Sequence, residues 1–363
     1  MSSLKSNAGR IVKPIKSYAE FWAWFQDNEK MFFDVVKNQD QIEKKFFDRL
    51  SSKLEELKEG YLYLTGMPDD NTVELIITAD GNIKNIVFVE ELVQSAPKID
   101  GWRFTALKPA SDIEDLIIEI GGYTLNDESI SFYTNEWPGY PDEIDIAIVY
   151  DHLTEKNKAQ VSKGIHLFLD NYLGELDFAT SIDNLTILGK REAQKGLIPI
   201  SKLKAFLTWK QKEFIEKYEG TYYNTENGNY SIFEAKNKSN KVLLATINTE
   251  LLNWDKKASH PWICILTLKY DGRNNNGMPN TNDYKLLNNI EEEIMQELKD
   301  GDGYLNIGRQ TADGEREIYF ACKDFRKPSK IFFKVQNKYS DFFEIGYDIY
   351  KDKYWRSFER FAH

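Results

Sequence analysis

The 363-residue sequence predicts an α+β fold in two domains. Residues 262–349 carry strand and helix patterns in the order β-α-β-β-α-β, which is the ferredoxin-like arrangement. Earlier helical stripes followed by short strands predict a mixed antiparallel sheet with helices, and excess acidic charge is confined to that earlier part. We therefore expect a flexible tail at 1–17, an acidic α+β domain at 18–195, a helical connector at 196–220 and a ferredoxin-like domain at 221–363.

The first domain begins with two amphipathic helices. Apolar residues recur at helical spacing from Phe21 to Val36 and again from Ile42 to Leu57, and Gly60 ends the second helix. Strands are predicted at 61–65, 72–78, 102–107, 116–125, 129–134, 144–150 and 185–188, and further helices at 83–95 and 156–173. Gly174 is expected to end the last of these helices, and 203–218 forms the connector helix.

The second domain has clearer local signals. A strand from Trp262 to Tyr270 is followed by a Gly/Asn-rich loop, and a helix then runs from about Thr281 to Leu298. Two strands flank Asp313-Gly314, a pair that supplies the positive φ of a tight hairpin. Pro328 opens the second helix, and a final strand alternates apolar residues over 343–349.

A set of short motifs stands out in this second domain: Trp262, Asn276-Gly277-Met278-Pro279, Ile290-Glu291, Gly308-Arg309, Asp313-Gly314 and Glu317-Ile318-Tyr319-Phe320. In this combination, residues 222–361 resemble the bacterial domain-of-unknown-function family 695. The resemblance carries over no activity, because none is assigned to that family. Some of its members are associated with a domain similar to the regulator of ribonuclease E, which implies regulation of RNA metabolism as one alternative.

The acidic charge is concentrated in one interval. The chain has 47 basic and 58 acidic side chains, a net charge of −11, yet residues 221–363 hold equal numbers. No Lys or Arg lies between Lys108 and Lys156, an interval with the carboxylates Asp112, Glu114, Asp115, Glu119, Asp127, Glu128, Glu136, Asp142, Glu143, Asp145, Asp151 and Glu155. Such a surface is either a solvated face or a docking face for a basic protein or a cation. Nucleic acid is not an expected partner, because phosphates require Lys and Arg.

We assign the docking role to Glu136, Asp142, Glu143 and Asp145 as candidate partner-binding residues. A second polar group lies in the hairpin of the second domain, where Arg309 and Arg316 could bind an anion through their guanidinium groups. The alternative for this hairpin is a cross-strand ion pair with Glu317.

No catalytic, cofactor-binding or metal-binding residue is predicted. The four histidines have no metal-ligand spacing, and Cys264 and Cys322 both fall inside predicted strands, as expected of buried thiols in a reducing cytoplasm. The first residues are polar and basic, unlike a signal peptide, and no segment reaches the roughly 20 apolar residues that span a membrane.

These observations favour a cytoplasmic, non-enzymatic interaction or regulatory protein, of inhibitor-like or immunity-like kind, that binds a basic partner through its acidic face. One alternative is an enzyme of unrecognised type that uses carboxylates such as Asp112 or Glu143 without a histidine. The other is the regulator of RNA metabolism that the family resemblance implies.

Overall fold

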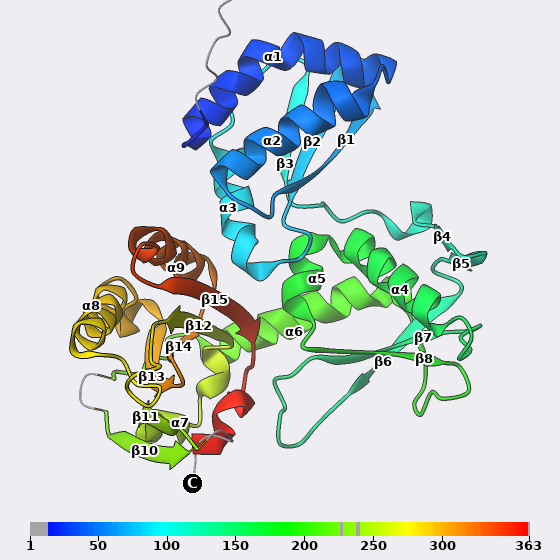
Figure 1. Cartoon of the computed structure of the whole chain (residues 1–363). Coiled ribbons are helices and arrows are strands. Elements are labelled where there is room, and N and C mark those ends of the chain that lie inside the picture. The colour runs from blue at the N-terminus through cyan, green and yellow to red at the C-terminus, as the bar shows by residue number, and fades with distance from the viewer. Residues whose placement is uncertain (1–13, 226–227, 237–239, 362–363) are drawn as a thin grey trace, which may run out of the picture. The chain divides into compact units, whose positions relative to one another are not determined.

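The computed structural model describes residues 14–225, 228–236 and 240–361, and its chain forms two compact units (Figure 1). The first unit comprises the residues up to Asp80 together with Phe88–Lys108, and the second comprises Gly81–Val87 and the chain from Pro109 onward. The α+β class is confirmed. The residues on both sides of the connector expected at 196–220 belong to the second unit. The domain boundary expected at this connector stays a prediction.

The first unit packs helices on a three-stranded sheet. Its elements are α1 (Tyr18–Asn38), the π-helical turn η1 (Glu43–Phe47), α2 (Asp48–Leu57), β1 (Leu62–Asp69), β2 (Thr72–Thr78), the part of α3 (Ile83–Gln94) from Phe88 onward and β3 (Trp102–Ala106). Residues 83–87 of α3 are assigned to the second unit. Strand β2 pairs antiparallel with β1 and parallel with β3. The aromatic stripe of α1 is core, because Phe21, Phe25 and Phe32 have no exposed surface.

The expected flexible tail needs a correction at its end. Residues 1–13 lie outside the described part of the chain, but Ile15 is buried and its backbone N–H donates to Glu56 at 2.6 Å. Ser17 then caps α1, since its hydroxyl accepts from the backbone N–H of Glu20 at 3.2 Å. The folded unit therefore begins before residue 18.

The second unit starts with a four-stranded sheet in the order β8-β7-β6-β9. The elements of this part are η2 (Ile113–Asp115), β4 (Ile118–Ile120), β5 (Tyr123–Leu125), β6 (Ile130–Asn135), β7 (Asp145–Tyr150), α4 (Lys158–Leu173), α5 (Glu175–Ser181), β8 (Asn184–Gly189), β9 (Ile198–Pro199), η3 (Ile200–Lys202) and α6 (Leu203–Tyr218). Apolar residues of α4, among them Ile165 and Phe168, join Ile146 and Ile148 of β7 in one core.

One expectation for this part was wrong. The single strand expected at 116–125 is the hairpin β4–β5, because Gly121 and Gly122 both take positive φ and reverse the chain. Gly174 ends α4 as expected, but it also starts α5 directly, so the helical region continues to Ser181.

The second unit ends with a six-stranded sheet in the order β10-β11-β13-β14-β12-β15, antiparallel throughout. Its elements are β10 (Tyr230–Lys236), β11 (Val242–Asn248), α7 (Thr249–Leu252), η4 (Lys257–Ser259), β12 (Trp262–Lys269), α8 (Thr281–Glu297), η5 (Asp300–Asp302), β13 (Tyr304–Ala312), β14 (Glu315–Cys322), α9 (Arg326–Tyr339), β15 (Glu344–Lys351) and η6 (Arg356–Phe361). Strands β10 and β11 were not predicted.

Both faces of this sheet are covered. Helices α8 and α9 lie side by side on one face (Figure 1), where Phe332 of α9 contacts the ring of Phe320. Tyr319, the neighbour of Phe320 on β14, points to the opposite face and packs with Trp355 and Phe358 at the chain end. Within the described residues, no helix is long and apolar enough to cross a membrane.

Candidate functional site

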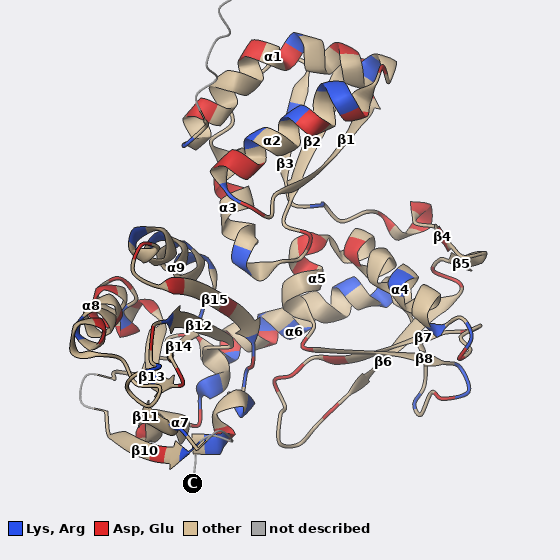
Figure 2. Cartoon of the chain, viewed as in Figure 1, with Lys and Arg blue, Asp and Glu red and all other residues tan. Residues whose placement is uncertain are grey.

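The acidic interval divides into an exposed part and an internally bound part. Glu155 is exposed and pairs with Lys158 at 3.6 Å. The other exposed carboxylates are Asp112, Glu114, Asp115, Glu119, Asp127, Glu128 and Glu136. None of them forms an ion pair with another residue of the described chain. Figure 2 shows the matching charge pattern, with red but no blue along β4, β5 and the connection from β6 to β7. This part of the interval is thus a free acidic surface.

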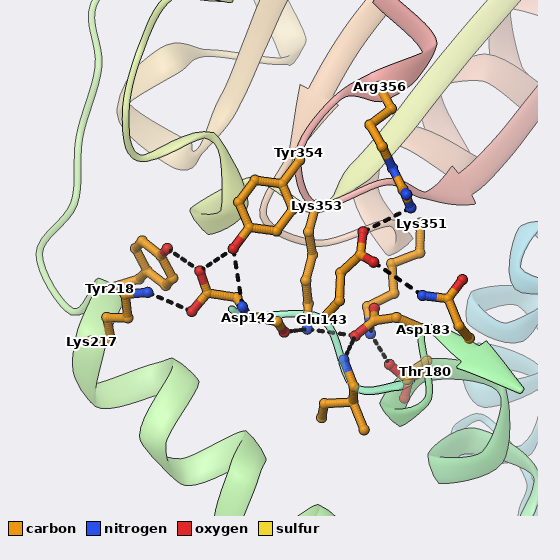
Figure 3. A network of polar contacts seen from close by, with 12 residues as sticks. Asp142, Glu143, Thr180, Asp183, Lys217, Tyr218, Lys351, Lys353, Tyr354 and Arg356 are labelled. Carbon is orange, nitrogen blue, oxygen red and sulfur yellow. Dashed lines mark hydrogen bonds and ion pairs between the residues drawn. The ribbon is translucent and has the colours of Figure 1, made fainter. Parts of the chain in front are cut away.

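Asp142 belongs to the internally bound part (Figure 3). Its carboxylate accepts from the Lys217 ammonium at 2.6 Å, from the Tyr354 hydroxyl at 2.7 Å and from the Tyr218 hydroxyl at 2.8 Å. Burial raises the pKa of Asp142, but the hydrogen bonds from Lys217, Tyr354 and Tyr218 outweigh it and hold the pKa below its usual value. The carboxylate is therefore ionised and already neutralised by a cation of the same chain.

Glu143, the neighbour of Asp142, is bound in the same way. One carboxylate oxygen accepts from the Arg356 guanidinium at 2.8 Å and the other from the Asn184 amide at 3.1 Å. The Arg356 guanidinium also lies over the ring of Tyr140, 4.8 Å from its centre. Only 4% of the Glu143 side chain is exposed, so it cannot present its charge to a separate molecule.

A third carboxylate, Asp183, completes the network, and the sequence analysis did not select it. Asp183 lies between two ammonium groups, those of Lys351 and Lys353, each at 2.7 Å, and it accepts from the backbone N–H of Ile144 at 2.7 Å. Figure 3 shows both lysines reaching this carboxylate. Lys351 is the last residue of β15, and Lys353 lies in the segment that follows it. Burial lowers the pKa of Lys351 to about 8 despite the nearby Asp183.

Asp145 differs from its neighbours because it has no cationic partner within the described residues. Its carboxylate is buried, with 9% of the residue exposed, and accepts from two neutral donors. These are the Asn135 amide at 3.1 Å and the Trp137 indole N–H at 2.9 Å. A carboxylate that is buried without a cation is disfavoured, and hydrogen bonds from neutral donors offset only part of that cost.

A cavity of about 400 Å³ lies beside Asp145. Its lining brings together three of the four candidate partner-binding residues, Glu136, Glu143 and Asp145, with the rings of Trp137, Tyr140 and Phe206. Lys210 also lines it, but the Lys210 ammonium is paired with Glu213 at 3.1 Å. Trp137 is 52% exposed, so an aromatic surface extends from the cavity to solvent. The fourth candidate, Asp142, lines a neighbouring cavity instead.

The two candidate anion-binding arginines lie near each other beside α8, and both already have partners within the chain. Arg309 lines a groove and pairs with Glu291 of α8 at 2.8 Å. Arg316 is only 1% exposed, and burial, reinforced by nearby Arg309, lowers its pKa. Its guanidinium donates to Asn288 at 2.7 Å and to Thr311 at 3.1 Å, so it is enclosed beneath α8.

The expected cross-strand ion pair with Glu317 is absent from the described contacts. Glu317 accepts instead from the Tyr319 hydroxyl at 2.5 Å and from Gln310 at 3.3 Å. Glu317 lies opposite Gln310 in the strand pairing, whereas Arg309 lies opposite Ile318. Arg309 and Glu317 therefore point to opposite faces of the sheet. The partner of Arg309 comes from helix α8, which sequence spacing within the hairpin could not indicate.

The comparison with protein families supports the resemblance found in the sequence. Residues 232–362 match a family of unknown function, DUF695. The resemblance of the C-terminal part to this family is thereby confirmed. No curated protein and no solved structure matches the chain in the two other comparisons.

The matched DUF695 segment, residues 232–362, contributes the basic side of the network in Figure 3. Lys351, Lys353 and Arg356 lie within it, whereas the carboxylates Asp142, Glu143 and Asp183 precede it. The network therefore ties the DUF695 segment to the preceding part of the same compact unit. Its geometry is that of a structural ion-pair network.

The alternative of a carboxylate enzyme rested on Asp112 and Glu143. Asp112 is exposed just before η2, and Glu143 is held by Arg356 and Asn184. Glu143 lines two cavities, and Asp112 lines neither of them. Within the described residues, no group of three or more His, Cys, Asp or Glu side chains is placed to hold a metal ion.

Proposed function

We propose that this chain is a non-enzymatic interaction protein that receives a cationic side chain of a basic protein partner in the cavity beside Asp145. The observation that carries the proposal is the buried Asp145 carboxylate, which among the described residues accepts only from the neutral donors Asn135 and Trp137. Buried charges in proteins are normally paired, and a lysine or arginine from a partner would supply the missing charge.

The walls of the cavity suit a cation. Trp137 and Phe206 line it with aromatic rings, and a cation within about 6 Å of a ring face is attracted by the ring. The ring of Tyr140 already has the Arg356 guanidinium over it. The volume of about 400 Å³ is within the range of ligand pockets, so a long side chain can enter it. Recognition would thus combine one buried charge pair with aromatic contacts.

The exposed carboxylates would act at longer range. Because residues 109–155 contain no lysine or arginine, this part of the chain has no basic group of its own to cancel the attraction of a basic surface. Such attraction raises the association rate more than the final affinity and weakens as salt screens it. The exposed carboxylates would therefore guide the partner, and Asp145 would hold it.

A regulatory or inhibitor-like role fits this mode of binding, since an inhibitor needs a complementary surface and no reaction chemistry.

For the C-terminal region we propose a ferredoxin-like arrangement. It is supported by the antiparallel strand order β13-β14-β12-β15 and by α8 and α9 on one face. The free, buried Cys264 and Cys322 fit the proposed cytoplasmic location.

The proposal is tested by capture from a lysate of the cells that express the chain, with wild type, Asp145→Asn and Asp127→Asn as baits. We expect wild type and Asp127→Asn to retain the same basic protein and Asp145→Asn to lose it. Asp127 is the matched control, because it is an exposed carboxylate of the same interval. Equal capture by all three correctly folded baits would refute the role of Asp145.

A further inference from the structure

A second binding site lies in the groove beside Arg309. The groove measures about 790 Å³ and is formed by the end of α8, by η5, by β10, β11 and β13, and by residues just before β10. Its lining includes Tyr222, Tyr230, Glu291, Met295, Lys299, Asp300, Asn306 and Arg309. It shares no lining residue with the cavity beside Asp145, so this inference is independent of the proposed function.

A bulge in β13 places two polar side chains in this groove. The pairing of β13 with β14 shifts between Asn306 and Gly308, which puts Asn306 and Arg309 on the same side although they are three residues apart. Gly308 has a φ of +137°, and a Cβ there would lie 2.1 Å from the carbonyl oxygen of Thr246. Only glycine allows this local geometry, so the bulge is built into the sequence.

Asn306 has an unused hydrogen-bond donor at this site. The residue is only 4% exposed, and its side-chain nitrogen Nδ2 has no hydrogen-bond partner among the described residues. An unsatisfied buried donor costs free energy that an acceptor on a bound molecule would recover. The amide therefore points to a ligand with an acceptor group.

Arg309 and Lys299 add further hydrogen-bond donors to the groove. The Arg309 guanidinium uses Nη1 for Glu291, which leaves its other N–H groups, and Lys299 is exposed without an ion pair in the described chain. Each of the three carboxylates near these donors has one oxygen engaged within the chain. Glu291 accepts from Arg309, Asp300 accepts from the backbone N–H and hydroxyl of Thr225 at 2.6 and 2.8 Å, and Asp302 pairs with Lys327 at 3.0 Å.

Apolar surface lies next to these donors. Tyr222 is 58% exposed, Met295 41% and Tyr230 39%, and all three line the groove. We propose that the groove binds a small organic monocarboxylate, with its carboxylate at Asn306, Arg309 and Lys299 and its apolar body against the tyrosines and Met295. A planar carboxylate matches the fork of a guanidinium group.

The charge of the lining favours a monoanion over a phosphate. Glu291, Asp300 and Asp302 place negative charge around the groove, whereas Arg309 and Lys299 supply the positive charge. A phosphate with nearly two negative charges would be repelled more strongly by the carboxylates than a singly charged carboxylate would be.

The test uses the full chain and ligand-detected NMR with matched probes. Phenylacetate, 3-phenylpropionate and hexanoate are each compared with the corresponding neutral primary amide, and inorganic phosphate is added as a competitor. We expect each carboxylate to bind about tenfold more tightly than its amide, because one hydrogen bond to a charged group changes the dissociation constant by about that factor.

Variants then locate the binding. Asn306→Asp keeps the shape of the side chain but replaces the free donor by a negative charge, and we expect it to weaken carboxylate binding by about tenfold or more. Lys299→Gln, an exposed change, should weaken it about twofold to threefold. Lys285→Gln removes an exposed lysine of α8 that does not line the groove, and it should leave binding unchanged.

Three results would overturn the assignment: no carboxylate of the panel binds, the amides bind equally well, or phosphate displaces the carboxylates at lower concentration than they bind. Because Lys299→Gln lies on the surface, its result stands even where Asn306→Asp disturbs folding. Equal binding by Lys299→Gln and Lys285→Gln would likewise contradict the placement of the carboxylate.

Discussion

Asp142 and Asp127 belong to the same lysine-free and arginine-free interval, yet their surroundings differ completely. Asp142 is held by Lys217, Tyr218 and Tyr354, whereas Asp127 is exposed without an ion pair in the described chain. Tyr354 comes from a position 212 residues further along the chain. The difference teaches that a local excess of charge does not by itself define a docking surface, because cations distant in sequence can neutralise part of it.

The largest effect is expected where two cations depend on one carboxylate. Asp183→Asn removes the negative charge between Lys351 and Lys353 and leaves two ammonium groups close together. We expect the free energy of unfolding to fall by about 3 to 5 kcal/mol, the usual cost of breaking a buried ion pair by removing one partner. Denaturant unfolding measures the change.

Asp127→Asn is the control for this comparison and should change stability by about 0.5 kcal/mol or less. If Asp183→Asn were as mild as this control, the network of Figure 3 would not contribute to stability. The stabilising role assigned to the ion pairs of Asp183 with Lys351 and Lys353 would then be contradicted.

A smaller effect, with a defined pH dependence, is expected at Asp142. The folded pKa of Asp142 lies below its unfolded value, so its ionised form stabilises the fold above about pH 4, and this stabilisation is lost as the pH falls through the folded pKa. Asp142→Asn should therefore cost about 2 kcal/mol at neutral pH. The difference from wild type should narrow below about pH 4.

Unfolding curves for both proteins between pH 2 and pH 8 provide the measurement. If the difference in the free energy of unfolding between wild type and Asp142→Asn stays constant over this range, packing or hydrogen-bond geometry, and not the charge of Asp142, stabilises the fold.

The smallest effect on stability is expected on the free surface. The combined change Glu119→Gln, Asp127→Asn and Glu128→Gln removes like charges and should leave the free energy of unfolding within about 0.5 kcal/mol of wild type, or slightly above it. The association rate with the captured basic partner should fall, and it should become less sensitive to salt. Stopped-flow measurements at two salt concentrations give the association rates of the variant and of wild type. An association rate unchanged by the substitutions would contradict the guiding role of these carboxylates.

Local sequence signals predicted much of the fold. The hairpin at Asp313-Gly314 has positive φ at both residues, as that pair indicated, and the helix expected at 203–218 is α6 with the same limits. Strand β10 was missed because its side chains are mostly exposed, so it has no apolar period; Ile232 is 76% exposed.

The candidate sites were harder to predict, for a physical reason. Glu136, Glu143 and Asp145 are close in sequence and do meet at one cavity. Arg356, the cation that binds Glu143, lies 213 residues away, so its role depends on tertiary structure. Asp183 and Asn306 carried no motif at all, and a binding role for Asn306 emerges only from the bulge and its unpaired amide nitrogen.

The central claim is that Asp145, unlike Asp142 and Glu143, is free to bind an external cation. The most direct measurement is an NMR titration of the full chain with N-acetylarginine methylamide and with the neutral citrulline analogue. We predict binding of the arginine compound that weakens by about tenfold or more in Asp145→Asn and is unchanged in Asp127→Asn. Equal binding of the two compounds, or equal binding by wild type and Asp145→Asn, would contradict the account.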